Sequence, residues 1–308
     1  MLTMPVLLSC SLALWLFVTI AGDACEDAIL GDDVSSNVWT RIVALVCYFS
    51  SAFILNSIHL FERRVGWLFS LFMWLAIQAL FVQHRYDVAL SVLVLVSSFS
   101  ILFSCQLAVD VERRFFMVFA FLGSSVFFMP ALILLLPIYV VFAYISNILT
   151  VKRFLAMQLG LVTPFWLAFG LAYVYDPAGI LFSCMKSFFC GLALFAFLPE
   201  SHVLLFMAAE LLVLVPAIVL LFGPLSSGKP LLMRRILFFL LLNVYCLFLS
   251  FMVPSRCELF YACSIPGTAV LASYIFTSKI TKLSNIYFIF VNLIWIILAF
   301  YCLWMELF

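Results

Sequence analysis

The chain has 308 residues, of which 68% are hydrophobic and 9% are charged, and its formal net charge is +1 at pH 7. An average soluble domain is roughly 45–50% apolar and about 25% charged, so the composition excludes a water-soluble fold. The small net charge and the lack of a long basic run also exclude nucleic acid as an expected partner. Membrane lipids are the expected surroundings.

Apolar runs that could cross a bilayer recur along the chain. A span needs about 20 largely apolar residues, and charges and helix breakers separate twelve candidates. They lie at about residues 4–20, 40–60, 65–82, 88–108, 115–128, 131–148, 155–175, 179–198, 203–222, 236–253, 259–277 and 286–305. The runs are apolar on all faces and their loops are short, which predicts helices and no soluble domain. We therefore expect an all-α polytopic integral membrane protein, a single transmembrane domain over residues 1–308 with about 11–12 helices.

The first and fifth candidates are the least regular. No Lys or Arg precedes residues 4–20, and the run exceeds the usual apolar region of a signal peptide, about 7–15 residues. We therefore expect a retained helix, with cleavage as the alternative. Segment 115–128 is short and meets the next segment at Met129 and Pro130. A tight helical hairpin is expected there, with one broken helix as the alternative.

Basic residues predict the orientation of the helices. Every second loop carries a basic pair: Arg63 and Arg64, Arg113 and Arg114, Lys152 and Arg153. The positive-inside rule makes these loops and the N-terminus cytoplasmic, and the loop at 21–37, acidic without a basic residue, faces outward.

Strict alternation of twelve spans would break this rule in the second half of the chain, where it places five basic residues outside: Lys229, Arg234, Arg235, Lys279 and Lys282. One segment should therefore fail to cross. Segment 179–198, interrupted by Lys186 and ended by Pro199, is expected to be interfacial or re-entrant. Eleven of the fifteen basic residues are then cytoplasmic.

Glu210 is the clearest candidate for a functional residue, because ionisable groups at membrane depth are costly and mark functional sites by default. It stands in the middle of 203–222, with Pro216 after it to loosen the helix. It could carry a proton or an ion, act as a general base, or join helices as a protonated or Lys-paired residue. Lys186 is its expected counter-ion, unless that side chain reaches the interface.

Other candidate site residues lie near the ends of the expected spans. Glu200 and His202 flank the segment that is expected not to cross, and with Glu210 and Lys186 they form the candidate catalytic set. The candidate substrate-binding residues are Arg85, Asp87 and Asp176. Arg85 and Asp87 could hold a phosphate or a polar head group, or could anchor the end of a helix.

Most of the ten cysteines lie within apolar runs and are expected to be buried hydrophobic residues. There is no CxxC and no nucleotide-binding or metalloprotease motif, so no metal and no cofactor is expected. Cys257 and Cys263 fall in the loop expected at 254–266 on the outer side. They could form a disulfide in an oxidising compartment, or remain two free interfacial thiols.

Three stretches carry a resemblance to a known family: Ala52-Phe53-Ile54-Leu55-Asn56; Arg113-Arg114-Phe115 leading to Phe119-Ala120-Phe121-Leu122-Gly123-Ser124 and Pro130; and Lys152-Arg153-Phe154-Leu155 before Gly160-Leu161-Val162-Thr163-Pro164. Over residues 41–175 the chain resembles a poorly characterised family of polytopic inner-membrane proteins of Bacteroidetes. The resemblance implies a bacterial inner membrane and no mechanism. A more distant similarity is to membrane glycosyltransferases and polysaccharide polymerases that use lipid-linked sugars, through the acidic first outer loop.

Whether the protein is an enzyme is open at this point, and three functions are considered, of which the first is the expected one and the other two are alternatives. The first is a component or subunit of a complex in the bacterial cell envelope, with membrane lipids and other membrane proteins as partners. The second is an enzyme that acts on lipid-linked sugars or lipids, with Arg85 binding phosphate. The third is a proton-coupled transporter that uses Glu210.

Overall fold

Helices form the whole described part of the protein. The computed structural model describes residues 34–58, 68–69, 71–76, 86–106, 110–126, 129–175, 201–222, 230–278 and 282–307, and these ranges contain no β-strand. The helices are α2 (Val34–Ser57), α4 (Tyr86–Ser104), α5 (Val111–Ser125), α6 (Leu136–Ile145), α7 (Val151–Tyr175), α9 (Ser201–Phe222), α10 (Pro230–Met252), α11 (Cys257–Ser278) and α12 (Lys282–Leu307), with 3-10 turns η1 (Pro130–Leu135) and η2 (Pro254–Arg256). The expected all-α class is confirmed.

The helices have the length and composition of membrane spans. Within the described ranges, five are long and apolar enough to cross a bilayer: Asp87–Ser104, Val151–Leu171, Val203–Phe222, Pro230–Met252 and Pro254–Phe276. Shorter apolar helices cover Ile42–Ser57, Pro130–Ile145 and Ile289–Leu298. The protein is therefore a multi-pass membrane protein. Among the expected segments, 4–20 and 179–198 lie outside the described residues, and 65–82 is described only at 68–69 and 71–76.

The boundaries of the helices follow the prolines. The expected break before Pro130 is present, since α5 ends at Ser125 and η1 begins at Pro130, where a missing N–H costs no helical hydrogen bond. Two boundaries differ from the expectation. Helix α10 begins at Pro230 and not at residue 236, so Arg235 lies inside it. The outer loop expected at 254–266 is η2 followed by the first turns of α11.

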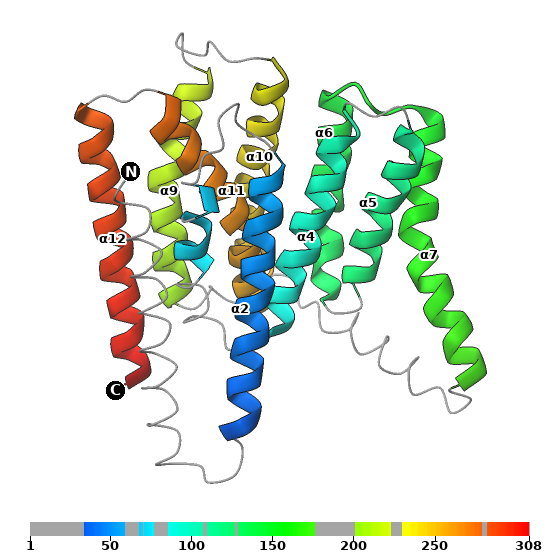
Figure 1. Ribbon diagram of the computed structural model, residues 1–308, viewed down its shortest axis with the longest axis horizontal. Helices are drawn as coiled ribbons and strands as arrows, with labels where there is room; N and C mark the ends of the chain where they lie inside the picture. The colour runs from blue at the N-terminus through cyan, green and yellow to red at the C-terminus, as the bar shows by residue number, and fades with distance from the viewer. Residues whose placement is uncertain are drawn as a thin grey trace.

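Helix α11 is the centre of the bundle and α7 is its edge (Figure 1). Helix α11 packs against α10, α9, α4 and α12, and 94% of its span is buried, against 11% of the α7 span. Helix α7 packs along α5 through two glycines. A Cβ on Gly123 would lie 2.7 Å from the Leu161 carbonyl oxygen, and one on Gly160 would overlap the Phe116 carbonyl. Most of the remaining surface of α7 faces outward.

A tight turn joins α6 to α7. Asn147 has a φ of 55°, the left-handed conformation that Asn tolerates better than most residues. Its N–H donates to the Tyr144 carbonyl (3.0 Å), and the Ile148 N–H donates to the Ala143 carbonyl (3.0 Å). These two bonds form a Schellman motif, which satisfies the last carbonyl groups of α6 and turns the chain back.

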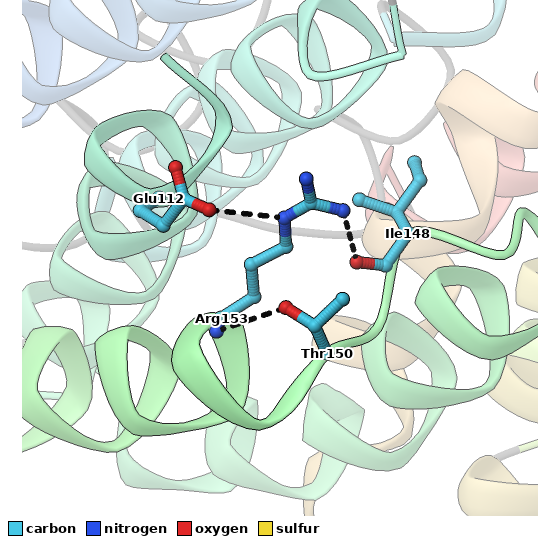
Figure 2. Close-up of polar contacts among 4 residues, drawn as sticks. All are labelled: Glu112, Ile148, Thr150 and Arg153. Atoms are coloured by element: carbon cyan, nitrogen blue, oxygen red, sulfur yellow. Dashed lines mark hydrogen bonds and ion pairs between the residues drawn. The ribbon is translucent and has the colours of Figure 1, made fainter.

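Arg153 fixes the start of α7 against its neighbours (Figure 2). Its guanidinium donates to the Ile148 carbonyl (2.7 Å) and forms an ion pair with Glu112 on α5 (3.5 Å). Its backbone N–H donates to Thr150 Oγ1 (3.4 Å), the cap of the helix. One arginine thus ties together the start of α5, the end of α6 and the start of α7.

Basic residues gather at one end of the bundle, which we call the basic end. Helices α5 and α7 start there, and α4 and α6 end there, because Arg114 donates to the Ser104 carbonyl (3.5 Å) and Gln106 donates to Ser146 Oγ (3.4 Å). Helix α10 also starts there, since Arg235 donates to Gln106 (3.2 Å). The described basic residues at this end are Arg113, Arg114, Lys152, Arg153, Arg234, Arg235 and Lys282.

The helices on either side of residues 176–200 run in opposite directions. Helix α7 is parallel to α5 and leaves the basic end. Helix α9 is parallel to α11, as the Phe206–Tyr261 contact (ring centroids 5.6 Å apart) and the Glu210–Ser264 bond require, and runs toward the basic end. The end of α7 and the start of α9 therefore lie at the same end of the bundle (Figure 1). Segment 179–198, which the sequence predicts not to cross, lies outside the described residues.

Candidate functional site: a carboxyl buried among three helices

A carboxyl group is buried where α9, α10 and α11 meet. Glu210 is 1% exposed, and its Oε1 lies 2.5 Å from Ser264 Oγ and 3.2 Å from Thr268 Oγ1, both on α11. The amide of Asn243 on α10 lies 2.9 Å from Thr268 Oγ1. We call these four residues the carboxyl cluster. All are buried, at a depth where α11 is covered on every side.

Two residues in the middle of α11 shape this cluster. Pro266 has no N–H, so the Ala262 carbonyl loses its helical donor and the helix is weakened at this turn. Gly267 lets α10 come close. A Cβ at this position would overlap the Asn243 amide and lie 3.2 Å from the Phe239 carbonyl oxygen. The hydroxyls of Ser264 and Thr268 are four residues apart, which places them on one face of the helix.

The hydroxyl groups have too few hydrogens for their acceptors. Ser264 Oγ carries one hydrogen but lies 2.5 Å from Glu210 Oε1 and 2.6 Å from the Tyr261 carbonyl oxygen. Thr268 Oγ1 likewise lies 3.2 Å from Glu210 Oε1 and 3.2 Å from the Ser264 carbonyl oxygen. Each hydroxyl therefore shares its one hydrogen between Glu210 Oε1 and a carbonyl of its own helix. A proton on Glu210 Oε1, donated to Ser264 Oγ, leaves the Ser264 hydrogen to the Tyr261 carbonyl.

Asn243 strengthens this count. Both sides of its amide are satisfied when Oδ1 accepts from Thr268 Oγ1 (2.9 Å) and the Thr268 N–H (3.1 Å), and Nδ2 donates to the Ser264 carbonyl (3.0 Å). In this orientation Asn243 takes the Thr268 hydrogen, so it is not available to Glu210. The hydrogen-bond network then fits a protonated carboxyl better than a carboxylate.

Glu210 has no positive partner within the described residues. No Lys, Arg or His there forms an ion pair with it, and its Oε2 makes no hydrogen bond to the part of the chain that the structure describes. Burying an unpaired carboxylate is very costly, so the neutral form is the one that this environment stabilises. Lys186, the expected counter-ion, lies outside the described residues. The site can therefore hold and release a proton at one oxygen-lined position.

The other sequence candidates are not brought to Glu210 by the described structure. Asp87 lies in the first turn of α4, where its Oδ1 accepts from the Val88 N–H (3.0 Å), as suits an acidic residue at a helix N-terminus. His202 lies in the first turn of α9, and its side chain is outside the described residues. Three further candidates also lie outside them: Arg85, Asp176 and Glu200.

Cys257 and Cys263 are buried on α11 and form no disulfide. Six residues of helix separate them by about 9 Å along the axis, beyond the roughly 7 Å that a disulfide allows between Cα atoms. The possible disulfide between them is therefore wrong, because it assumed a loop where the chain is helical. The alternative, two thiols that are not bonded to each other, fits the helix, but both thiols are buried and not at an interface.

Known proteins offer no guide to this site. No family model, curated protein or solved structure matches the chain. The resemblance to the Bacteroidetes family and the distant similarity to glycosyltransferases stay predictions. The assignment of the site rests on the geometry of the carboxyl cluster.

Sequence reasoning missed the residues that surround Glu210. Asn243, Ser264 and Thr268 are neutral, and no sequence pattern says which helices touch. A signal was nevertheless present. Asn243 interrupts an apolar span, and Ser264 and Thr268 flank the Pro266-Gly267 pair, the type of helix break that lines binding sites in membrane proteins.

Proposed function

We propose that the protein is a proton-coupled transporter in which Glu210 is the proton-binding residue. The observation that carries this proposal is a buried carboxyl with a hydrogen deficit around Oε1 and no described partner at Oε2. Coupling ions in secondary transporters bind near the bilayer centre, where helices are interrupted. Glu210 is at the middle of α9, and both α9 and α11 contain an internal proline, Pro216 and Pro266.

Proton binding at this site would select between two arrangements of the helices. With the proton bound, Glu210 is neutral and donates to Ser264, so α9 and α11 pack closely. Without it, a carboxylate is left in an apolar bundle with too few donors, which favours an arrangement that admits water or a counter-ion. The prolines provide places where α9 and α11 can bend.

We place the protein in the inner membrane of a bacterial cell, with the basic end and the N-terminus in the cytoplasm. The positive-inside rule supports this orientation, because the seven described Lys and Arg residues of the basic end lie on one side of the bundle. The resemblance over residues 41–175 supports the type of membrane.

The envelope-subunit function is the main competitor, and it requires no titrating group. The enzyme function depends on Arg85 and on carboxylates of the loop at 21–37, which lie outside the described residues. The transporter and the envelope-subunit functions make different predictions for Glu210. In a transporter the proton on Glu210 must exchange with water, whereas in a subunit the Glu210 hydrogen bonds only have to hold the helices together.

Labelling with dicyclohexylcarbodiimide tests proton exchange directly, because this reagent modifies protonated carboxyls in apolar surroundings. The purified protein in lipid nanodiscs should be labelled at Glu210, faster at low pH than at high pH, as located by mass spectrometry. Glu210→Gln should abolish this adduct. Glu112→Gln is the matched control, because Glu112 is half exposed and paired with Arg153. No labelling of Glu210 at any pH would sink the proposal.

Transport itself is tested on supported proteoliposomes, by recording charge movement when the pH on one side is stepped. We expect a transient current in the native protein and in Glu112→Gln, and the protein-free background in Glu210→Gln. An equal current in Glu210→Gln would move the proton site elsewhere. Equal currents in protein-containing and protein-free vesicles would favour the subunit function.

A further inference from the structure

Arg235 is a second buried charge, near the basic end of α10. It is 6% exposed. Its Nε–H donates to Gln106 Oε1 (3.2 Å), and its Nη2 lies 3.5 Å from the Phe103 carbonyl oxygen, with the Phe103 ring centroid 5.6 Å from the guanidinium carbon. Gln106 donates in turn to Ser146 Oγ (3.4 Å). The guanidinium is thus enclosed between the ends of α4 and α6.

These contacts leave the charge of Arg235 without an anion. A guanidinium has five N–H donors, and the two hydrogen bonds above use two of them. No acidic side chain within the described ranges forms an ion pair with it. Arg153, at the same end of the bundle, forms an ion pair with Glu112 (Figure 2), and its side chain is 23% exposed. Arg235 is more deeply buried and has no such carboxylate within the described ranges, although burying a guanidinium without an anion is costly.

We propose that Arg235, Gln106 and Ser146 bind a small oxyanion, a carboxylate or a phosphate group, and that this anion is the substrate carried with the proton of Glu210. A guanidinium matches both groups through two parallel N–H bonds, and the Gln106 amide and the Ser146 hydroxyl provide neutral donors beside it. The cotransport part rests on the proposed function. The anion site rests on the surroundings of Arg235.

Charge balance explains why the two sites would be coupled. With neither ligand, in the arrangement that admits water, Arg235 is positive and Glu210 is negative, so the two charges cancel. With both ligands, the anion neutralises Arg235 and the proton neutralises Glu210, so they cancel again. The described structure, with Glu210 neutral and no anion at Arg235, corresponds to the proton alone and leaves the charge of Arg235 for an anion to balance. Arg235 lies eight residues, about 12 Å along the axis of α10, from Asn243 of the carboxyl cluster. Two charges about 12 Å apart at an effective dielectric constant of about 20 would couple roughly tenfold, which sets the size of the expected effect.

Arg235 is the buried permanent charge, among the described residues, that an anion could neutralise and so change proton binding at Glu210. The buried thiols and phenols in this part of the bundle are neutral at physiological pH: Cys246 on α10, Cys263 and Tyr261 on α11, and Tyr48 on α2. Tyr287 on α12 is also a phenol, and its hydroxyl donates to the Leu212 carbonyl. The charge state of Arg235 is therefore the expected source of any response of Glu210 to an anion.

The test measures carbodiimide labelling of Glu210 against pH in phosphatidylcholine nanodiscs, with sodium acetate, with inorganic phosphate, and with sodium chloride at equal ionic strength. Acetate or phosphate, but not chloride, should raise the midpoint pH of labelling by about one unit. Arg235→Gln should have the raised midpoint without any anion and should not respond further. Arg153→Gln, the matched control, should respond like the native protein.

Arg235→Lys replaces Arg235→Gln in this test if the glutamine variant does not fold. Lysine keeps the charge but loses the two parallel N–H donors. The midpoint pH of Glu210 labelling without an anion should therefore equal that of the native protein, and the shift caused by the anion should be smaller. Identical midpoints with acetate, phosphate and chloride would overturn the inference while Glu210 labelling, and with it the proposed function, stands. A raised midpoint only in phosphatidylglycerol nanodiscs would assign the site to a lipid head group and overturn cotransport. Loss of all Glu210 labelling would instead remove the proposed function.

Discussion

The two sides of the bundle treat their charged residues differently. Between α5 and α7, Glu112 and Arg153 pair at the end of the bundle, with side chains 50% and 23% exposed. Among α9, α10 and α4, Glu210 and Arg235 are 1% and 6% exposed, and neither meets an opposite charge within the described residues. The first arrangement costs little and stabilises the fold slightly. The second is costly, and this cost is the reason that we propose functional roles for Glu210 and Arg235.

The largest effect is expected where the core is tightest. Gly267→Val should lower the free energy of unfolding by about 3 kcal/mol, because its side chain would overlap Asn243 and push α10 away from α11. Gly170→Val on α7 is the matched control, since nothing lies within 4 Å of a Cβ there. Detergent titration followed by circular dichroism measures both. Equal losses in the two variants would contradict the contrast between core and edge.

A smaller effect is expected from the hydroxyls of the carboxyl cluster. Ser264→Ala removes the 2.5 Å contact with Glu210, and in a double-mutant cycle with Glu210→Gln the two should couple by about 0.6–1.7 kcal/mol. The control is Thr163→Ala on α7, whose hydroxyl bonds only its own helix at the Leu159 carbonyl (2.6 Å). It should change stability by under about 0.5 kcal/mol. A coupling of zero would mean that Ser264 and Glu210 do not interact.

The smallest effect is expected at the exposed ion pair. Arg153→Gln should cost about 0.5–1 kcal/mol at low ionic strength, and less at high salt, because the pair is partly exposed and therefore screened. The same unfolding titration, repeated at two salt concentrations, measures it. A loss above about 3 kcal/mol is the size expected for a buried ion pair. It would contradict the difference drawn between the exposed Glu112–Arg153 pair and the buried Glu210 and Arg235.

The sequence was sufficient for what depends on hydropathy and proline. It predicted the helical spans of the described residues, the break before Pro130 and the position of Glu210 inside a span, because each depends on the chain near that residue. It placed Arg235 in a loop, because charge was taken as the end of a span, whereas the helix begins at Pro230 and buries the arginine against the Phe103 ring. The partners of Glu210 come from residues 33 to 58 positions away, and only packing brings them together.

The unequal lengths of α5 and α7 bear on the lipid around the protein. Helix α5 has 15 residues and α7 has 25, or about 22 Å and 37 Å, against a hydrocarbon core of about 30 Å. Both start at the basic end, and α7 continues past the end of α5 (Figure 1). Lipids beside α5 must compress, whereas the 21-residue apolar stretch Val151–Leu171 of α7 covers about 31 Å and matches the hydrocarbon core. This hydrophobic mismatch makes the edge of the protein sensitive to bilayer thickness, so acyl-chain length should shift its distribution among membranes.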